Sequence, residues 1–107
     1  MPVPQISVAE LETTLAAGAR LYDVREQHEY AAAHVDGGVL IPLGDVVESV
    51  DSFQDDRTIY LICASGARSG RAVEFLRSKG LDAVNVAGGT IAWINSGRPV
   101  VSDGQSV

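Results

Sequence analysis

The only cysteine of the chain, Cys63, opens the stretch CASGARSG at residues 63–70. A free thiol with a pKa of about 8.5 is only a few per cent thiolate at neutral pH, but a helix N-terminus or a nearby arginine lowers that pKa to roughly 3.5–7.5. The small residues after Cys63 let the backbone wrap closely around an anion, and Arg68 is placed to turn its guanidinium toward the same spot. The stretch therefore predicts a nucleophilic thiolate whose bound anion or leaving group is held by backbone amides rather than by a metal.

The segments on either side of this stretch position the thiol. The run Thr58–Cys63 is almost continuously apolar, which is typical of a strand buried on both faces. The pattern after it predicts an amphipathic helix from Ser69 to Lys79, followed by Gly80. Cys63 would then lie in a loop between a strand and a helix N-terminus, where unpaired N–H groups and the helix dipole favour an anion.

Helix and strand patterns alternate along the rest of the chain. Ser7 and Glu10 form a capping box at the start of the first predicted helix, and Gly18 ends that helix. We further predict a strand at 21–24, one or two helical turns within 25–38, a buried strand at 39–41, a short helix within 44–53, a strand at 83–86 and a last helix packed through Ile91, Trp93 and Ile94. This alternation favours right-handed crossovers between parallel strands.

These elements predict a single α/β domain of three layers, in which helices cover both faces of a central, mainly parallel sheet of about five strands. We expect the domain to span residues 1–107, with a core from about residue 5 to 99 and a flexible tail at 100–107. In such sheets ligands bind beyond the C-terminal ends of the strands, and Asp23, Cys63 and the turn at 87–89 fall there.

The composition is that of an ordinary globular domain, with 46% hydrophobic and 21% charged residues. A net charge of −6 argues against nucleic acid or an anionic membrane as partner, because both require a basic footprint, but it leaves a small anionic substrate open. One cysteine forms no intrachain disulfide, and the start of the chain lacks a basic segment followed by an apolar one. We therefore expect a cytoplasmic protein.

Several polar residues allow two interpretations. A lone cysteine ending an apolar strand is often just a small buried hydrophobe, although the C-x-x-G-x-R-S pattern here favours a functional thiol. Asp23 either pairs with Arg68 or caps the strand before it, and Arg25 and Glu29 have the spacing of a local helical pair. The two histidines and the cysteine lack the spacing of zinc ligands, so no metal or other cofactor is expected.

Three segments in order resemble the rhodanese family of single-domain sulfurtransferases. CASGARS resembles the active-site loop of that family, LYDVREQHEYAAAHVDGGVLIPL resembles its opening signature, and VNVAGGTIAW resembles its closing Gly-Gly-x-x-x-Trp segment. The matches run from about residue 20 to residue 99. At the matching positions the resemblance implies a structural role for His34, and His28 looks exposed on a short polar helix, so a Cys-His couple is disfavoured.

The resemblance implies a mechanism in which Cys63 takes sulfur from thiosulfate or another sulfane donor, becomes a persulfide, and passes that sulfur to cyanide, a thiol or a protein. Arg68 matches the closing arginine of the loop and would support the catalytic thiolate electrostatically. The remaining loop residues and the first helical serine would bind the substrate anion: Ala64, Ser65, Gly66, Ala67 and Ser69. The six residues from Cys63 to Arg68 match sulfurtransferases, whereas the related dual-specificity phosphatases have one residue more.

One position departs from the family pattern. Many members that use thiosulfate carry Arg or Lys directly after the cysteine, and this chain has Ala64. The loss of a cation beside a dianionic substrate, in a chain of net charge −6, favours a persulfide or a protein as donor. Two alternatives to a thiosulfate sulfurtransferase therefore remain: a sulfur-relay or binding module fed by a protein partner, and a cysteine phosphatase or arsenate reductase, which the loop length disfavours.

Overall fold

The computed structural model describes residues 3–103. Its elements follow the chain in this order: β1 (Gln5–Ile6), α1 (Val8–Ala16), β2 (Arg20–Asp23), α2 (Gln27–Ala32), β3 (Gly38–Leu40), the 3-10 helices η1 (Leu43–Asp45) and η2 (Val50–Phe53), β4 (Ile59–Ile62), α3 (Ala67–Ser78), β5 (Ala83–Val86) and α4 (Gly89–Asn95). The strands form one five-stranded sheet in the order β1-β5-β4-β2-β3, and every pair is parallel.

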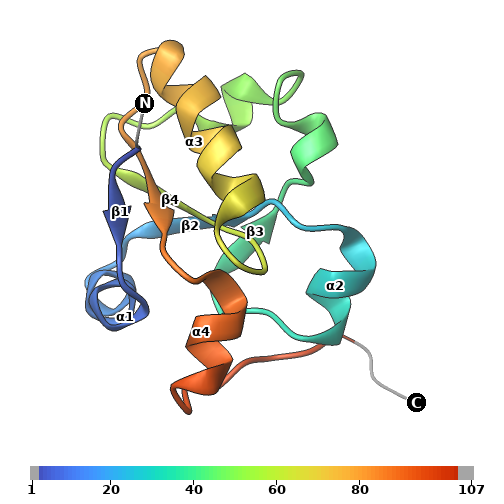
Figure 1. The fold of residues 1–107 in the computed structure, drawn as a ribbon. Helices are drawn as coiled ribbons and strands as arrows, with labels where there is room; N and C mark the ends of the chain where they lie inside the picture. The colour runs from blue at the N-terminus through green and yellow to red at the C-terminus, as the bar shows by residue number, and fades with distance from the viewer. Residues whose placement is uncertain (1–2, 104–107) are drawn as a thin grey trace.

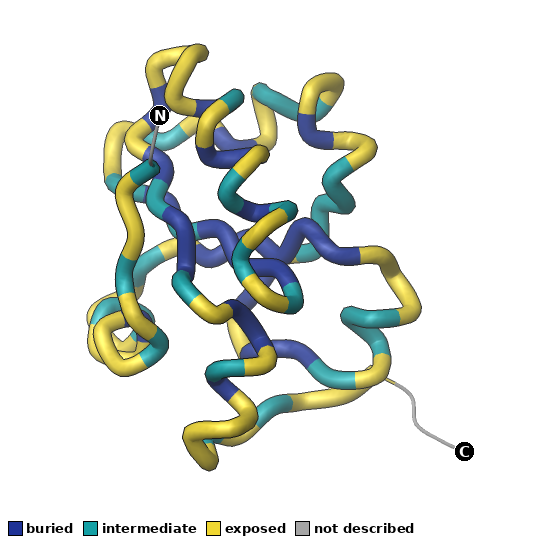
Figure 2. The backbone as a smooth tube through the Cα atoms, viewed as in Figure 1, coloured by how far each residue is buried: buried dark blue, intermediate teal, exposed yellow. Residues whose placement is uncertain are grey.

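Helices cover both faces of this sheet, as predicted. In Figure 1, α3 and the 3-10 helices lie on one side of the sheet, and α1 and α4 lie on the other. One cluster of core residues joins the sheet to α3, η1 and η2 and includes Phe53, Leu61 and Leu76, while a second joins it to α1 and α4 and includes Leu11 and Trp93. The sheet between the two clusters is the most buried part of the molecule (Figure 2). The three-layer α/β architecture is confirmed.

The predicted central strand takes the position that its apolar run requires. β4 pairs with β2 on one side and with β5 on the other. Ile59 and Leu61 pack toward α3, while Tyr60 and Ile62 pack toward α1 and α4, which is the alternation that a pleated strand imposes. Two neighbouring strands and the helices on both faces of the sheet contact β4. Its C-terminal end, which Cys63 follows, is therefore held in place.

The first helix begins and ends as its sequence predicts. Ser7 Oγ accepts a hydrogen bond from the Glu10 N–H at 3.1 Å, and a Glu10 carboxylate oxygen accepts one from the Ser7 N–H at 2.8 Å. These two bonds are the reciprocal pair of a capping box. Gly18 follows α1 with a φ of +94°, the left-handed conformation that glycine adopts without strain.

Four expectations about local structure were wrong. Residues 44–53 form two 3-10 helices in place of one short helix. The third strand is not buried, because β3 is an edge strand that pairs only with β2, and Val39 is 54% exposed. In α4 only Trp93 packs into the core; Ile91 and Ile94 point outward. The helix after Cys63 begins at Ala67, two residues earlier than predicted, because Gly66 already provides its N-cap.

Two contacts of the chain ends were not foreseen. β1, a strand of only two residues, pairs with β5 and closes that edge of the sheet. Near the other end, Val101 exchanges backbone hydrogen bonds with His34, at 2.8 and 2.9 Å, and the Asp103 N–H bonds to the Ala31 carbonyl. The expected tail from residue 100 is thus tied to the domain over its first residues, and residues 104–107 lie outside the described part of the chain.

Candidate active site

Cys63 directly follows β4 and opens a tight loop that leads into α3. Gly66 is the N-cap of α3 and has a φ of +107°, a backbone conformation that glycine adopts far more readily than other residues. This turn brings the Gly66 N–H back to the Cys63 Sγ, at 3.0 Å. The sulfur therefore receives a backbone N–H at the start of a helix, as the sequence predicts.

The thiol is more enclosed than expected, since Cys63 is only 1% exposed. Besides the Gly66 N–H, the Ser69 hydroxyl lies 3.3 Å from Sγ. Burial is the largest single influence and raises the pKa of the Cys63 thiol, but hydrogen bonds from the Ser69 hydroxyl and from the backbone N–H groups of Ser69, Gly66 and Ser65 together outweigh it. The net effect is a thiol pKa below its ordinary value, which increases the thiolate fraction at neutral pH.

The start of α4 holds the cysteine loop from the opposite side. The Thr90 N–H and hydroxyl both donate to the Cys63 carbonyl, at 2.9 and 3.1 Å, and the Ile91 N–H donates to the Ala64 carbonyl at 3.0 Å. At Gly89, a Cβ would collide with the carbonyl oxygens of Cys63 and Ala64. Gly89 of the closing segment is thus required for the close approach of the two backbones.

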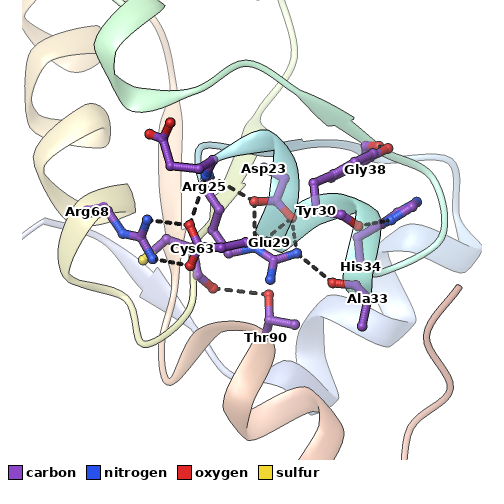
Figure 3. Close-up of polar contacts among 11 residues, drawn as sticks. Asp23, Arg25, Glu29, Tyr30, Ala33, His34, Gly38, Cys63, Arg68 and Thr90 are labelled. Atoms are coloured by element: carbon purple, nitrogen blue, oxygen red, sulfur yellow. Dashed lines mark hydrogen bonds and ion pairs between the residues drawn. The ribbon is translucent and has the colours of Figure 1, made fainter. Parts of the chain in front are cut away.

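Arg68 lies beside the sulfur, and its guanidinium makes a two-pronged pair with Glu29 of α2 (Figure 3), with N–O distances of 2.7 and 2.9 Å. The hydrogen bonds from Arg68 are the main reason that the pKa of Glu29 falls to about 2, and the same pair raises the pKa of Arg68, to which a charged Cys63 also contributes. Arg68 therefore carries a full positive charge at neutral pH, and Glu29 offsets it.

The two ion pairs of this region differ from both expected pairings. Asp23 does not reach Arg68; instead its carboxylate accepts from the Arg25 guanidinium at 2.9 to 3.2 Å, and Arg25 also donates to the Ala33 carbonyl at 2.7 Å. Arg25 and Glu29 do not form the local pair either, because Glu29 pairs with Arg68 across 39 residues of sequence. Asp23 and Arg25 are both buried, so this pair fixes the connection between β2 and α2.

The other predicted site residues are four loop residues and Ser69. In the loop, Ser65 and Ala67 are exposed, and Ala64 and Gly66 are half-buried around the sulfur. Ser69 is fully buried and faces Sγ from the first turn of α3, so it reaches the thiol rather than the open side of the loop. The loop from 64 to 68 therefore frames the sulfur, while Ser69 supports it from within.

The histidines stand apart from the thiol. His34 is 6% exposed, its ring stacks on Tyr30 with centroids 3.7 Å apart, and its Nδ1 lies 2.7 Å from the Tyr30 carbonyl. His28 is exposed on α2. Within residues 3–103 no three His, Cys, Asp or Glu side chains are grouped so that they could hold a metal ion, and no helix there is long and apolar enough to cross a membrane.

Three residues of the site escaped the sequence analysis: Glu29 as partner of Arg68, Thr90 beneath the cysteine carbonyl, and Asn85 in the middle of β5. Asn85 is 3% exposed, and its side chain contacts both Ser69 and the Gly66 carbonyl. An asparagine inside an otherwise apolar strand pattern was a usable signal, because a buried amide needs hydrogen-bond partners. The partners of Glu29 and Thr90 depend on tertiary packing.

Comparisons with known proteins agree with this geometry. The sequence model of the family described as "Rhodanese-like domain" matches residues 7–96. YtwF of Bacillus subtilis, provisionally named a sulfurtransferase, is 36% identical over 101 residues, which are 92% of this chain and 98% of YtwF. YrkF of the same organism, provisionally named a sulfur carrier protein, is 36% identical over 94 residues; the chain spans 85% of its own length there but only 51% of YrkF.

A solved structure shows the same fold. The crystal structure of a rhodanese-related protein from Thermoplasma volcanium superimposes with a TM-score of 0.86 at 37% sequence identity, covering 92% of this chain and 97% of that one. The matched family model covers both the cysteine loop and the Gly-Gly segment that holds it. From its fold, its loop and these relatives, the chain belongs to the family of rhodanese-like domains.

Proposed function

We propose that this domain transfers sulfane sulfur, with Cys63 as the residue that carries it. The observation that supports this most directly is the pair of donors on Cys63 Sγ, the Gly66 N–H at 3.0 Å and the Ser69 hydroxyl at 3.3 Å. Groups that donate to a sulfur stabilise its anion over its protonated form. The relatives YtwF and YrkF carry provisional names of the same chemistry, sulfur transfer and sulfur carriage.

The first half-reaction forms a sulfur–sulfur bond at Cys63. The thiolate attacks the outer sulfur of the donor, the bond between that sulfur and the rest of the donor breaks, and the leaving group departs with the electron pair. With thiosulfate the leaving group is sulfite, and with an organic persulfide it is a thiolate. The terminal persulfide sulfur that results carries a negative charge, which backbone N–H groups of the loop from 64 to 68, at the start of α3, would stabilise.

The second half-reaction regenerates the thiolate. A nucleophile such as cyanide or a thiolate attacks the terminal sulfur, the persulfide bond breaks, and Cys63 leaves with the electron pair. Its lowered pKa makes it a better leaving group than an ordinary thiolate. The same hydrogen bonds to Sγ thus assist both steps, and neither step needs a cofactor.

The cysteine loop suits a persulfide as sulfur donor better than it suits thiosulfate. Arg68 is the one cation that the loop provides, and Glu29 offsets its charge. Ala64 places a methyl group where a cation would help a dianion, and Ile91, whose N–H bonds to the Ala64 carbonyl, is 52% exposed at the same border. An apolar border with a neutralised arginine suits a donor that brings less charge than thiosulfate.

A partner-fed relay module is the second candidate, and this apolar border is the observation that favours it. A protein that presents a persulfide would bring its own complementary surface and would not need a cation in the loop. No contact among the described residues of the site favours the phosphatase or arsenate reductase alternative in the same way. Cys63-dependent hydrolysis of an aryl phosphate such as p-nitrophenyl phosphate would be the evidence for a phosphatase.

The test is the formation of thiocyanate from cyanide, with thiosulfate and with glutathione persulfide supplied as separate donors. The proposed function predicts turnover with the persulfide donor and slower turnover with thiosulfate, both lost in Cys63→Ala. Turnover by Cys63→Ala at the wild-type rate would remove the cysteine from the mechanism. Turnover with neither donor would leave the partner-fed module as the remaining form of sulfur transfer.

A further inference from the structure

Asn85 connects the cysteine loop to the sheet through both ends of its amide group. It lies in β5, opposite Gln5 of β1 and Leu61 of β4 in the parallel register. The Asn85 Nδ2 donates to the Gly66 carbonyl and to the Gln5 Oε1, both at 3.1 Å. The Gly66 carbonyl can only accept, so the amide nitrogen must face it and Oδ1 must face Ser69. The Ser69 Oγ lies 2.5 Å from that oxygen.

The Ser69 hydroxyl therefore has one proton to donate and two acceptors that compete for it. Its hydroxyl lies between Asn85 Oδ1 at 2.5 Å and Cys63 Sγ at 3.3 Å, and all three residues are buried. A hydroxyl donates a single hydrogen bond, and Oδ1 can only accept. When Cys63 is a thiol, its S–H can donate to Ser69 and Ser69 can donate to Asn85. When Cys63 is a thiolate, Ser69 can donate its proton to the sulfur instead, and Asn85 then loses that bond.

We propose that Asn85 is a positioning residue of the sulfur-transfer site, which acts through the Ser69 hydroxyl and competes with the Cys63 sulfur for its proton. The inference rests on the proposed function and deepens it. Asn85 orients the hydroxyl, fixes the carbonyl of the turn that carries the Gly66 N–H, and sets how much of the Ser69 proton the thiolate receives. Sulfur chemistry at Cys63 is thus linked to a strand that does not touch the sulfur.

Two ion pairs lie around the cysteine loop: Arg68 of α3 with Glu29 of α2, and Arg25 with Asp23 at the end of β2, the strand beside β4. The pKa of Glu29 is about 2 and that of Arg68 is raised, so both stay charged near neutral pH. Thr90, which packs against the loop from α4, carries no charge. A titration near neutral pH therefore reports on Cys63 itself.

The first test follows the side-chain carbonyl carbon of Asn85 by NMR in the wild-type protein as the thiol is titrated. The midpoint of the Cys63 titration comes from the rate of alkylation by iodoacetamide. We expect the Asn85 carbonyl signal to move with the same midpoint and to stay still in Cys63→Ser. An Asn85 signal that does not respond to the ionisation of Cys63 would overturn the proposal.

The second test compares Asn85→Leu, which has nearly the same shape but no acceptor, with Asn85→Asp. Without a competing acceptor Ser69 donates only to the sulfur, so Asn85→Leu should lower the alkylation midpoint by about half to one pH unit. The carboxylate of Asn85→Asp should raise it. A purely structural role predicts the opposite result for Asn85→Leu, because a loosened loop loses its donors and the thiol pKa rises toward its ordinary value. A raised midpoint in Asn85→Leu would therefore contradict the proposal.

The same substitution in a Ser69→Ala background distinguishes action of Asn85 through the Ser69 hydroxyl from a purely structural role of Asn85. There, Asn85→Leu should no longer lower the midpoint, since no hydroxyl remains to redirect, whereas an equal lowering with and without Ser69 would overturn the proposal. The alkylation and NMR measurements need no sulfur donor. If the wild-type protein took up no sulfur while the Asn85 carbonyl titrated with Cys63, sulfur transfer from these donors would fail and the coupling between Asn85 and Cys63 would stand. If it took up sulfur while the Asn85 carbonyl did not titrate with Cys63, only the proposed role of Asn85 would fail.

Discussion

At the scale of single residues, the Cys63 thiol receives hydrogen bonds from neutral donors, and the one nearby cation, Arg68, is paired with a carboxylate. The Gly66 N–H and the Ser69 hydroxyl lower the pKa of Cys63 against the opposing effect of burial. Arg68 adds charge nearby, but the Glu29 carboxylate accepts a hydrogen bond from each of its two terminal nitrogens. Charge at the sulfur is therefore controlled by hydrogen bonds more than by free cations.

A cation placed after the cysteine should change donor preference. In Ala64→Arg we expect kcat/KM for thiosulfate to rise about tenfold, roughly 1.4 kcal/mol, because a guanidinium would meet the dianion at the loop. Turnover with glutathione persulfide should change much less. Ala64→Gln, of similar reach but without charge, is the matched control. An equal gain in Ala64→Gln would show that charge at this position is not what limits thiosulfate.

The ion pair between Glu29 and Arg68 should have a recognisable pH signature. Because the folded pKa of Glu29 is about 2, below its ordinary value of 4.5, the pair stabilises the fold fully above pH 4.5 and loses that effect as the pH falls through about 2. For this partly exposed pair, Glu29→Gln should lower the free energy of unfolding by about 0.5–1 kcal/mol at pH 7.

Denaturant unfolding at several pH values measures this effect. The difference between wild type and Glu29→Gln should shrink below pH 4.5 and vanish near pH 2. The control is Glu48→Gln, which removes an equal charge from an exposed position. A difference that stayed constant down to pH 2 would mean that the charge of Glu29 does not stabilise the fold.

At the scale of elements, the site forms where the end of β4 and the starts of α3 and α4 meet. α4 donates to the carbonyls of Cys63 and Ala64, and the backbones approach so closely that Gly89, with a φ of +59°, leaves no space for a side chain. The shape of the loop thus depends on a helix that begins 26 residues after the cysteine.

This close approach predicts a large effect for one methyl group. Gly89→Ala would place its Cβ 2.6 Å from the Ala64 carbonyl oxygen, so the loop must move. We expect a loss of unfolding free energy well above that of Gly18→Ala, and slower alkylation of Cys63. Gly18 is the matched control, because it also has a positive φ but no atom within 4 Å of the added Cβ, which leaves only a backbone cost of about 1–2 kcal/mol. Equal losses in the two variants would contradict the account.

The elements that sequence predicted best are those whose signal is local. The capping box of α1 and the apolar run of β4 depend on neighbouring residues, and both are confirmed. The exposure of Val39 was missed because the same short apolar run fits a central or an edge strand, and only the sheet order distinguishes them. Within the site, Cys63 and its loop follow from a contiguous motif, whereas the pairing of Arg68 with Glu29 depends on how α2 packs.

At the scale of the whole molecule, a domain of net charge −6 repels an anionic reactant such as thiosulfate. The fold encloses Cys63 almost completely, with only 1% of the residue exposed, so a reactant must reach the sulfur past the loop that frames it. The overall charge acts on that approach from a distance, and salt screens it.

Ionic strength should therefore affect turnover with thiosulfate. Between 0.01 and 0.15 M salt the screening length falls from about 30 to about 8 Å, which weakens repulsion between this chain and a dianion. We expect kcat/KM for thiosulfate to rise several-fold over this range. A fall with salt for thiosulfate would indicate that a local positive field at the loop outweighs the net charge.

The central claim is that Cys63 carries sulfur, and intact mass spectrometry tests it most directly. Reduced wild-type protein and Cys63→Ser would each be incubated with thiosulfate and, separately, with glutathione persulfide. We predict that the wild type gains the mass of one sulfur atom from the persulfide donor, that cyanide removes it, and that Cys63→Ser gains none. If neither donor adds sulfur to the wild type, transfer from small donors is contradicted and only the partner-fed module remains; if Cys63→Ser gains sulfur equally, the assignment of Cys63 as the sulfur carrier is contradicted.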